Sequence, residues 1–203
     1  MSEQIQDEEV MVSNFDVEEF YGDMGLRWYQ IAARNETIEH IRNGVKRICI
    51  ELPTGAGKTI TISALLNSAS MRDALGIEGN KLKVLFVAHK HRLLTQAEKT
   101  FAKENGVDLM VQSMMSQISE EYIKKGWDII VLDECHHESC QSFQYHLEKL
   151  GDFVIIGLTA TSDRADGSLI KFSEFVKPIS REQAVEEGYL AETHLYSFVD
   201  APE

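Results

Sequence analysis

Short apolar runs alternate along this chain with longer segments in which apolar residues recur at helical spacing. The runs that predict β-strands are residues 48–52, 84–88, 109–112, 129–132 and 153–158. The segments that predict helices are residues 29–42, 60–71, 93–104, 117–125 and 142–150. The predicted strands are apolar throughout, which is typical of strands buried on both faces in a parallel sheet. The pattern therefore predicts a doubly wound α/β domain, a parallel sheet with helices on both faces, whose ligands bind beyond the carboxyl ends of the strands.

One predicted strand end carries a glycine-rich stretch. Residues 52–59 read LPTGAGKT and join the apolar run 48–52 to a predicted helix. Backbone N–H groups in such a loop surround an anion, and the N-terminus of the following helix adds partial positive charge. The stretch predicts a phosphate-binding loop in which Lys58 reaches the β and γ phosphates and the Thr59 hydroxyl binds Mg²⁺. Leu52 stands where the general pattern has glycine, and a surface turn before a helix is the alternative.

A second strand end carries carboxylates. The apolar run 129–132 leads into Asp133 and Glu134, which fit a Mg²⁺ position and the residue that polarises an attacking water. Solvated acids at a strand end are the alternative. Zinc is a further alternative for the neighbouring cluster of Cys135, His136, His137 and Cys140. Adjacent ligands at a strand exit point in divergent directions, so the sequence favours a site without structural zinc.

A third polar stretch, residues 157–164, follows the last predicted strand. Thr159 and Thr161 present two hydroxyls separated by one residue. This spacing is suited to bridging a carboxylate or His136 to a group across the site. An ordinary polar loop is the alternative.

Composition limits the class of protein. A chain of 203 residues has room for one α/β domain with a full core. Three cysteines without paired spacing encode neither a disulfide framework nor a four-ligand zinc site. They favour a reducing, cytoplasmic location, nucleoid-associated in a bacterium or phage. No apolar run approaches the length of a membrane span, so we expect no membrane partner.

Charge is unevenly distributed. The net charge of −13 argues against a general nucleic-acid binder, but residues 1–23 contribute −8 of it and the other 180 residues only −5. Residues 1–25 are interpreted as an acidic N-terminal extension, either a solvated tail or an interaction arm.

Six motifs in order carry a family resemblance. They are residues 26–30 (LRWYQ), 53–59 (PTGAGKT), 86–96 (FVAHKHRLLTQ), 111–113 (VQS), 133–136 (DECH) and 158–161 (LTAT). Together they resemble the first RecA-like domain of superfamily 2 helicases and translocases, over about residues 26–199. The DECH variant, the stretch 157–167 and the stretch 179–190 resemble the DNA repair and recombination branch of that superfamily.

The resemblance implies a role for each matching residue. ATP with Mg²⁺ is the implied cofactor, and Gln30 would read the adenine edge with Arg27 beside it. The implied nucleotide-binding residues are Arg27, Gln30, Thr54, Gly55, Ala56, Gly57, Lys58 and Thr59. The implied catalytic residues are Lys58, Asp133, Glu134 and His136, with Thr59 and Asp133 on Mg²⁺.

The resemblance also implies residues that act on nucleic acid. Coupling of ATP to nucleic acid would use His136, Thr159 and Thr161, and nucleic-acid contacts would use His89, Lys90, Arg92, Gln112 and Ser113. Lys90 and Arg92 also fit a solvated helix start, whereas Trp28 and Trp127 are interpreted as packing residues.

The same resemblance implies a partner. A working motor of this superfamily closes a second RecA-like domain over the ATP, so residues 200–203 are interpreted as the start of a linker to a domain outside this chain. We therefore expect the chain to be the ATP-binding half of an ATP-dependent helicase or translocase. The expected substrate is single-stranded or branched DNA in repair, recombination or replication. A non-catalytic, nucleotide-dependent interaction module without a second domain is the alternative.

Overall fold

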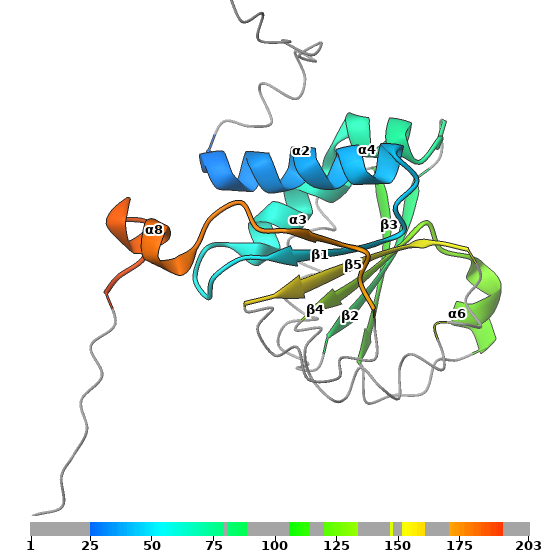
Figure 1. Cartoon of the computed structure of the whole chain (residues 1–203). Coiled ribbons are helices and arrows are strands. Elements are labelled where there is room, and N and C mark those ends of the chain that lie inside the picture. The colour runs from blue at the N-terminus through cyan, green and yellow to red at the C-terminus, as the bar shows by residue number, and fades with distance from the viewer. Residues whose placement is uncertain are drawn as a thin grey trace, which may run out of the picture.

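The computed structural model describes residues 25–78, 81–88, 106–113, 120–133, 147, 152–160 and 171–192 (Figure 1). The helices are α2 (Trp28–Arg42), α3 (Lys58–Asn67), α4 (Ala69–Ala74), α6 (Glu120–Lys125) and α8 (Arg181–Glu186). The strands are β1 (Arg47–Glu51), β2 (Leu82–Ala88), β3 (Val107–Ser113), β4 (Ile129–Asp133), β5 (Val154–Thr159) and β6 (Glu174–Val176). The acidic extension up to residue 24 and the predicted helix 93–104 lie outside the described residues.

The strands form one sheet in the order β3-β2-β4-β5-β1-β6, and every recorded pairing is parallel. The predicted parallel α/β sheet is therefore confirmed, with all five predicted strands in place. The sixth strand, β6, was not predicted. It is only three residues long, and it pairs with β1 along one edge of the sheet.

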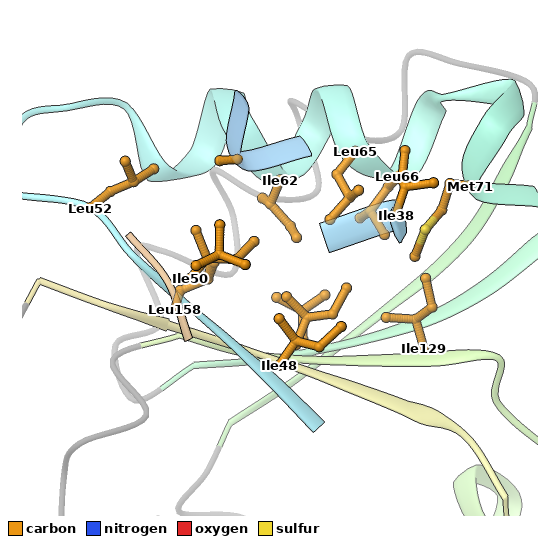
Figure 2. Packing of buried hydrophobic residues seen from close by; sticks show 14 of the residues in the cluster. Ile38, Ile48, Ile50, Leu52, Ile62, Leu65, Leu66, Met71, Ile129 and Leu158 are labelled. Carbon is orange, nitrogen blue, oxygen red and sulfur yellow. The ribbon is translucent and has the colours of Figure 1, made fainter. Parts of the chain in front are cut away.

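Apolar side chains cover both faces of the sheet. On one face, α2, α3 and α4 pack over the strands, and Ile62, Leu65 and Leu66 of α3 lie above Ile48 and Ile50 of β1 (Figure 2). On the other face a second cluster gathers Cys49, Leu85, Ile130 and Trp127, with Tyr122 of α6 packed against it. Each buried leucine or isoleucine contributes roughly 1.5–3 kcal/mol to the free energy of unfolding. The apolar core therefore stabilises the sheet that positions the polar residues at its rim.

One detail of the sequence interpretation is wrong. Residues 60–71 form two helices instead of one, because Ser68 between α3 and α4 has an extended backbone (φ −67°, ψ 134°). Asn and Ser hydrogen-bond locally and favour helix ends over helix interiors. Trp28 is 42% exposed, but its ring packs edge-on against Tyr29, and Trp127 is buried, so both are packing residues, as predicted.

The remaining helix predictions hold where the structure describes them. α2 covers the predicted segment 29–42, and α6 covers the described part of the segment 117–125. Within the segment 142–150 only Leu147 is described, and it is helical and buried. No helix in the described ranges is long and apolar enough to cross a membrane.

Candidate nucleotide site

The glycine-rich stretch forms a tight loop between β1 and α3. The Leu52 N–H donates to the Thr159 carbonyl (3.0 Å), and the Ala56 N–H donates to the Pro53 carbonyl (3.0 Å). Gly55 and Gly57 have left-handed backbones, with φ of 88° and 90°. Gly57 is the residue before α3, so the loop runs directly into the N-terminus of a ten-residue helix. This arrangement gives an anion both backbone N–H donors and the positive end of the helix dipole.

The N-terminus of α2 holds this loop from outside. The Tyr29 hydroxyl donates to the Ala56 carbonyl (2.9 Å), and the Gln30 Nε2 donates to the same oxygen (3.1 Å). The Arg27 Nη1 donates to the Tyr29 hydroxyl (2.8 Å). Tyr29 and Gln30 are both buried. Tyr29 belongs to the motif at residues 26–30, but the sequence implied no role for it, because its contact with Ala56 forms only in the folded chain.

The position of the Gln30 side chain also explains why residue 57 is a glycine. A Cβ added at Gly57 would lie 2.5 Å from the Gln30 Nε2, which is far inside van der Waals contact. The Gln30 amide is held at both ends, because its Oε1 accepts from the Arg27 N–H (3.0 Å) while its Nε2 binds Ala56. The loop and the start of α2 are therefore one packed unit.

Two further candidates lie on the same edge of the sheet as the loop. Asp133 ends β4 opposite Leu158 of β5, and Thr159 ends β5 opposite Glu51 of β1. Asp133 is 8% exposed and Thr159 is 2% exposed. The parallel register of three neighbouring strands thus brings the glycine-rich loop, Asp133 and Thr159 to one rim of the sheet, which is the placement expected from the sequence.

The groups at this rim fit a Mg²⁺-nucleotide. Lys58 is half-buried, and its Nζ lies 3.4 Å from the Leu52 carbonyl, so the ammonium group folds back across the loop. Thr59, also half-buried, follows it in the first turn of α3. The Thr59 hydroxyl and the Asp133 carboxylate are hard oxygen ligands of the kind that Mg²⁺ prefers. The residues present therefore fit the cofactor that the sequence implies.

The candidates for nucleic-acid contact are partly described. Gln112 and Ser113 end β3, where Ser113 pairs with Ala88 of β2, and the Gln112 Nε2 donates to the Ser113 carbonyl (3.2 Å). β3 forms the edge of the sheet away from β1 and β6. The predicted residues His89, Lys90, Arg92, Glu134, His136 and Thr161 lie outside the described residues.

The residues of the alternative zinc cluster, Cys135, His136, His137 and Cys140, also lie outside the described residues. Among the residues that are described, no group of three or more His, Cys, Asp or Glu side chains is placed to hold a metal ion. The absence of structural zinc stays a prediction.

Comparison with known sequences matches most of the chain. The family model for the res subunit of type III restriction enzymes matches residues 23–109 and 107–164. Over 166 residues the chain is 31% identical to the putative ATP-dependent helicase IRC3 of Saccharomyces cerevisiae, which covers 70% of this chain and 24% of the yeast protein. It is 26% identical over 196 residues to an endonuclease subunit of the type I restriction enzyme EcoAI of Escherichia coli, covering 81% of this chain and 23% of that subunit. The chain thus spans about a quarter of the length of these curated relatives.

Solved structures share the fold. The type ISP restriction-modification enzyme LlaGI, solved in complex with a DNA substrate mimic, superposes with a TM-score of 0.64 at 18% identity, covering 81% of this chain and 20% of that one. The UvsW helicase of bacteriophage T4 superposes with a TM-score of 0.53 at 22% identity, covering 75% of this chain and 60% of that one. At these identities the likeness concerns the arrangement of the strands and helices.

Proposed function

Because this chain belongs to the family of type III restriction enzyme res subunits and is a RecA-like domain of a superfamily 2 helicase, we propose that it is the ATP-binding half of a DNA helicase or translocase motor. We further propose that this motor acts in DNA repair, recombination or replication. The proposal about DNA rests on the DECH variant and on the stretches 157–167 and 179–190.

One observation carries the nucleotide part of the proposal. The glycine loop meets the N-terminus of α3 at the rim where Asp133 and Thr159 end their strands. The loop is also tied to the start of α2 by two hydrogen bonds to the Ala56 carbonyl. A surface turn would need neither this double anchor nor a buried carboxylate two strands away. The geometry is that expected of a nucleotide site.

In the proposed reaction each side chain has a distinct task. Lys58 and the loop N–H groups bind the phosphates, and Thr59 with Asp133 holds Mg²⁺. When bound, Mg²⁺ neutralises charge that develops on the transferred phosphoryl group. Glu134 orients the attacking water, and Thr159, Thr161 and His136 transmit the state of the nucleotide towards the nucleic acid. These tasks are part of the proposal.

The relatives support a nucleic-acid substrate. LlaGI was solved with a DNA substrate mimic, and the SWI2/SNF2 ATPase core of Sulfolobus solfataricus was solved with double-stranded DNA and superposes with a TM-score of 0.52. We propose that His89, Lys90, Arg92, Gln112 and Ser113 contact the DNA backbone. The acidic charge concentrated in residues 1–23 leaves the rest of the chain closer to neutral, which is compatible with this role.

We also propose that a second RecA-like domain completes the motor. The curated relatives are about four times as long as the stretch that this chain matches, which leaves room in them for further domains. Such a domain would close over the nucleotide and supply an arginine to the γ-phosphate.

Titration with a fluorescent ATP analogue and Mg²⁺ tests the nucleotide site. Lys58→Ala removes a charge-assisted contact worth roughly 1.5–3 kcal/mol, so we expect binding about 10- to 100-fold weaker. The matched control is Lys81→Ala, which removes the same charge from an exposed position directly before β2. Lys81 therefore lies at the amino-terminal end of a strand, whereas the loop lies at the carboxyl-terminal end of β1. Equal affinity of Lys58→Ala and wild type would contradict the assignment of the phosphate loop.

A further inference from the structure

The segment that follows α8 lies against the nucleotide loop although it is remote in sequence. We call residues 187–190 the α8 wall. Figure 1 shows α8 beside the turn that follows β1, near the start of α2. The Trp28 Nε1 donates to the Glu187 Oε2 (2.8 Å) across 159 residues of sequence, and both Tyr189 and Leu190 pack against the main core.

Tyr189 contacts Tyr29, which binds the loop, and Arg27, which binds Tyr29. Its ring packs edge-on against Tyr29, with ring centres 5.4 Å apart and planes at 72°. The Arg27 guanidinium carbon lies over the Tyr189 ring, 5.0 Å from its centre. Tyr189 therefore holds Arg27 from one side while the Tyr29 hydroxyl accepts a hydrogen bond from the same guanidinium.

Leu190 touches the loop itself. A Cβ added at Gly55 would lie 3.1 Å from the Leu190 Cδ2. The wall thus contacts two parts of the proposed nucleotide site, with Leu190 beside Gly55 of the loop and Tyr189 beside Arg27.

Two hydrogen bonds to α8 hold the backbone of the wall in place. The Ala184 carbonyl accepts from both the Tyr189 N–H (2.8 Å) and the Leu190 N–H (2.9 Å), and Ala184 is fully buried. The left-handed Gly188 (φ 75°) makes this reversal possible. At the other end of α8, hydrogen bonds from the Glu182 backbone N–H and then from the Ser180 hydroxyl hold the pKa of the Glu182 carboxyl below its usual value.

We propose that the α8 wall is part of the nucleotide-base subsite, and that Tyr189 is a positioning residue that holds Arg27 for stacking on a purine base. The inference rests on the proposed ATP site. A guanidinium stacks well on flat aromatic groups, and the negative face of the Tyr189 ring attracts it electrostatically. Arg27 also donates its backbone N–H to Gln30, so the same residue orients the amide that faces the loop.

In this proposal different residues bind the base and the phosphates of the nucleotide. Tyr189 lies against Arg27 and Tyr29, whereas Lys58 lies in the loop. Loss of the Tyr189 ring should weaken the binding of ATP but leave inorganic tripolyphosphate, which has no base, almost unaffected. Loss of the Lys58 side chain should weaken the binding of both ATP and tripolyphosphate.

The test compares five proteins: wild type, Tyr189→Phe, Tyr189→Leu, Lys58→Ala and the control Glu186→Ala, which changes an exposed residue of α8. Isothermal titration measures the affinity of each for Mg²⁺-ATP and Mg²⁺-tripolyphosphate. We expect Tyr189→Leu, which keeps apolar bulk but has no ring, to bind ATP about tenfold more weakly, as expected for the loss of one cation–π and one aromatic contact. Tyr189→Phe keeps the ring and should bind ATP like wild type.

The outcomes separate this inference from the proposed function. Wild type that binds neither ligand would overturn both. If wild type binds ATP, Lys58→Ala loses this binding and Tyr189→Leu keeps full affinity for ATP, the base subsite alone is overturned. Equal weakening of ATP and tripolyphosphate in Tyr189→Leu would also overturn it, since that result describes general damage to the loop. Thermal unfolding of each variant without ligand checks that the fold is kept.

Discussion

Replacing Gly57 with alanine should damage both the stability of the domain and the geometry of its loop. Gly57 has φ 90° and lies directly before α3. The new methyl group would lie 2.5 Å from the Gln30 Nε2, so the Gln30 amide has to leave the Ala56 carbonyl. The substitution therefore combines a backbone penalty with the loss of a buried hydrogen bond.

The magnitude follows from these two parts. A left-handed backbone costs a residue with a Cβ roughly 1–2 kcal/mol, offset by about 0.4–1 kcal/mol because alanine restricts the unfolded chain. Loss of the Gln30 hydrogen bond adds about 1 kcal/mol, and more where the Ala56 carbonyl loses its partners. We expect a total destabilisation of about 1–3 kcal/mol, which lowers Tm by roughly 5 °C in a domain of this size.

The chain offers a matched control in Gly44. It has a similar backbone, with φ 81°, but a Cβ there meets no atom within 4 Å. Gly44→Ala should therefore show only the backbone part of the loss. In the double variant Gly57→Ala with Gln30→Ala the clash disappears, so its destabilisation should be smaller than the sum of the two single effects.

Urea unfolding of the four variants, followed by circular dichroism, gives the required free energies. The reasoning is refuted if Gly57→Ala is no less stable than Gly44→Ala, or if the Gln30 and Gly57 effects simply add. Either result would mean that Gln30 does not limit the space at Gly57.

Two further predictions concern composition and turnover. Purified protein should carry no stoichiometric zinc, because Cys135, His136, His137 and Cys140 are interpreted as motor-motif and helix residues; one zinc per chain in elemental analysis would contradict this. The 203-residue chain measured alone should hydrolyse ATP near background with or without single-stranded DNA, because an arginine supplied by another domain is worth roughly 10³–10⁵ in rate. Strong DNA-stimulated turnover that disappears in Glu134→Gln would show that the proposed second domain is not required.

Much of the central sheet was predictable from the sequence because the responsible signals are local. A buried parallel strand such as β2 is apolar in nearly every position, and this pattern does not depend on which strand lies beside it. The glycine loop was predictable for a similar reason, since Gly55 and Gly57 adopt left-handed backbones that other residues avoid. Asp133 and Thr159 followed from the rule that carboxyl ends of parallel strands share one edge.

Features that depend on residues far apart in the sequence became apparent only in the structure. β6 is a strand because Glu174, Phe175 and Val176 pair with β1, and three residues of mixed polarity carry no periodic signal of their own. The order of the strands likewise depends on long-range packing. Ser68 shows a different limit, because helical periodicity continues across a residue whose backbone is extended.

The surroundings of the nucleotide site depended most on tertiary structure. The sequence identified Arg27 and Gln30 only through a family resemblance, and it assigned no role to Tyr29 or Tyr189. Their contacts join the start of α2, the loop after β1 and the segment after α8. Local sequence determines the backbone preferences of each of these segments, but only the folding of the chain around the sheet brings their side chains within a few ångströms of one another.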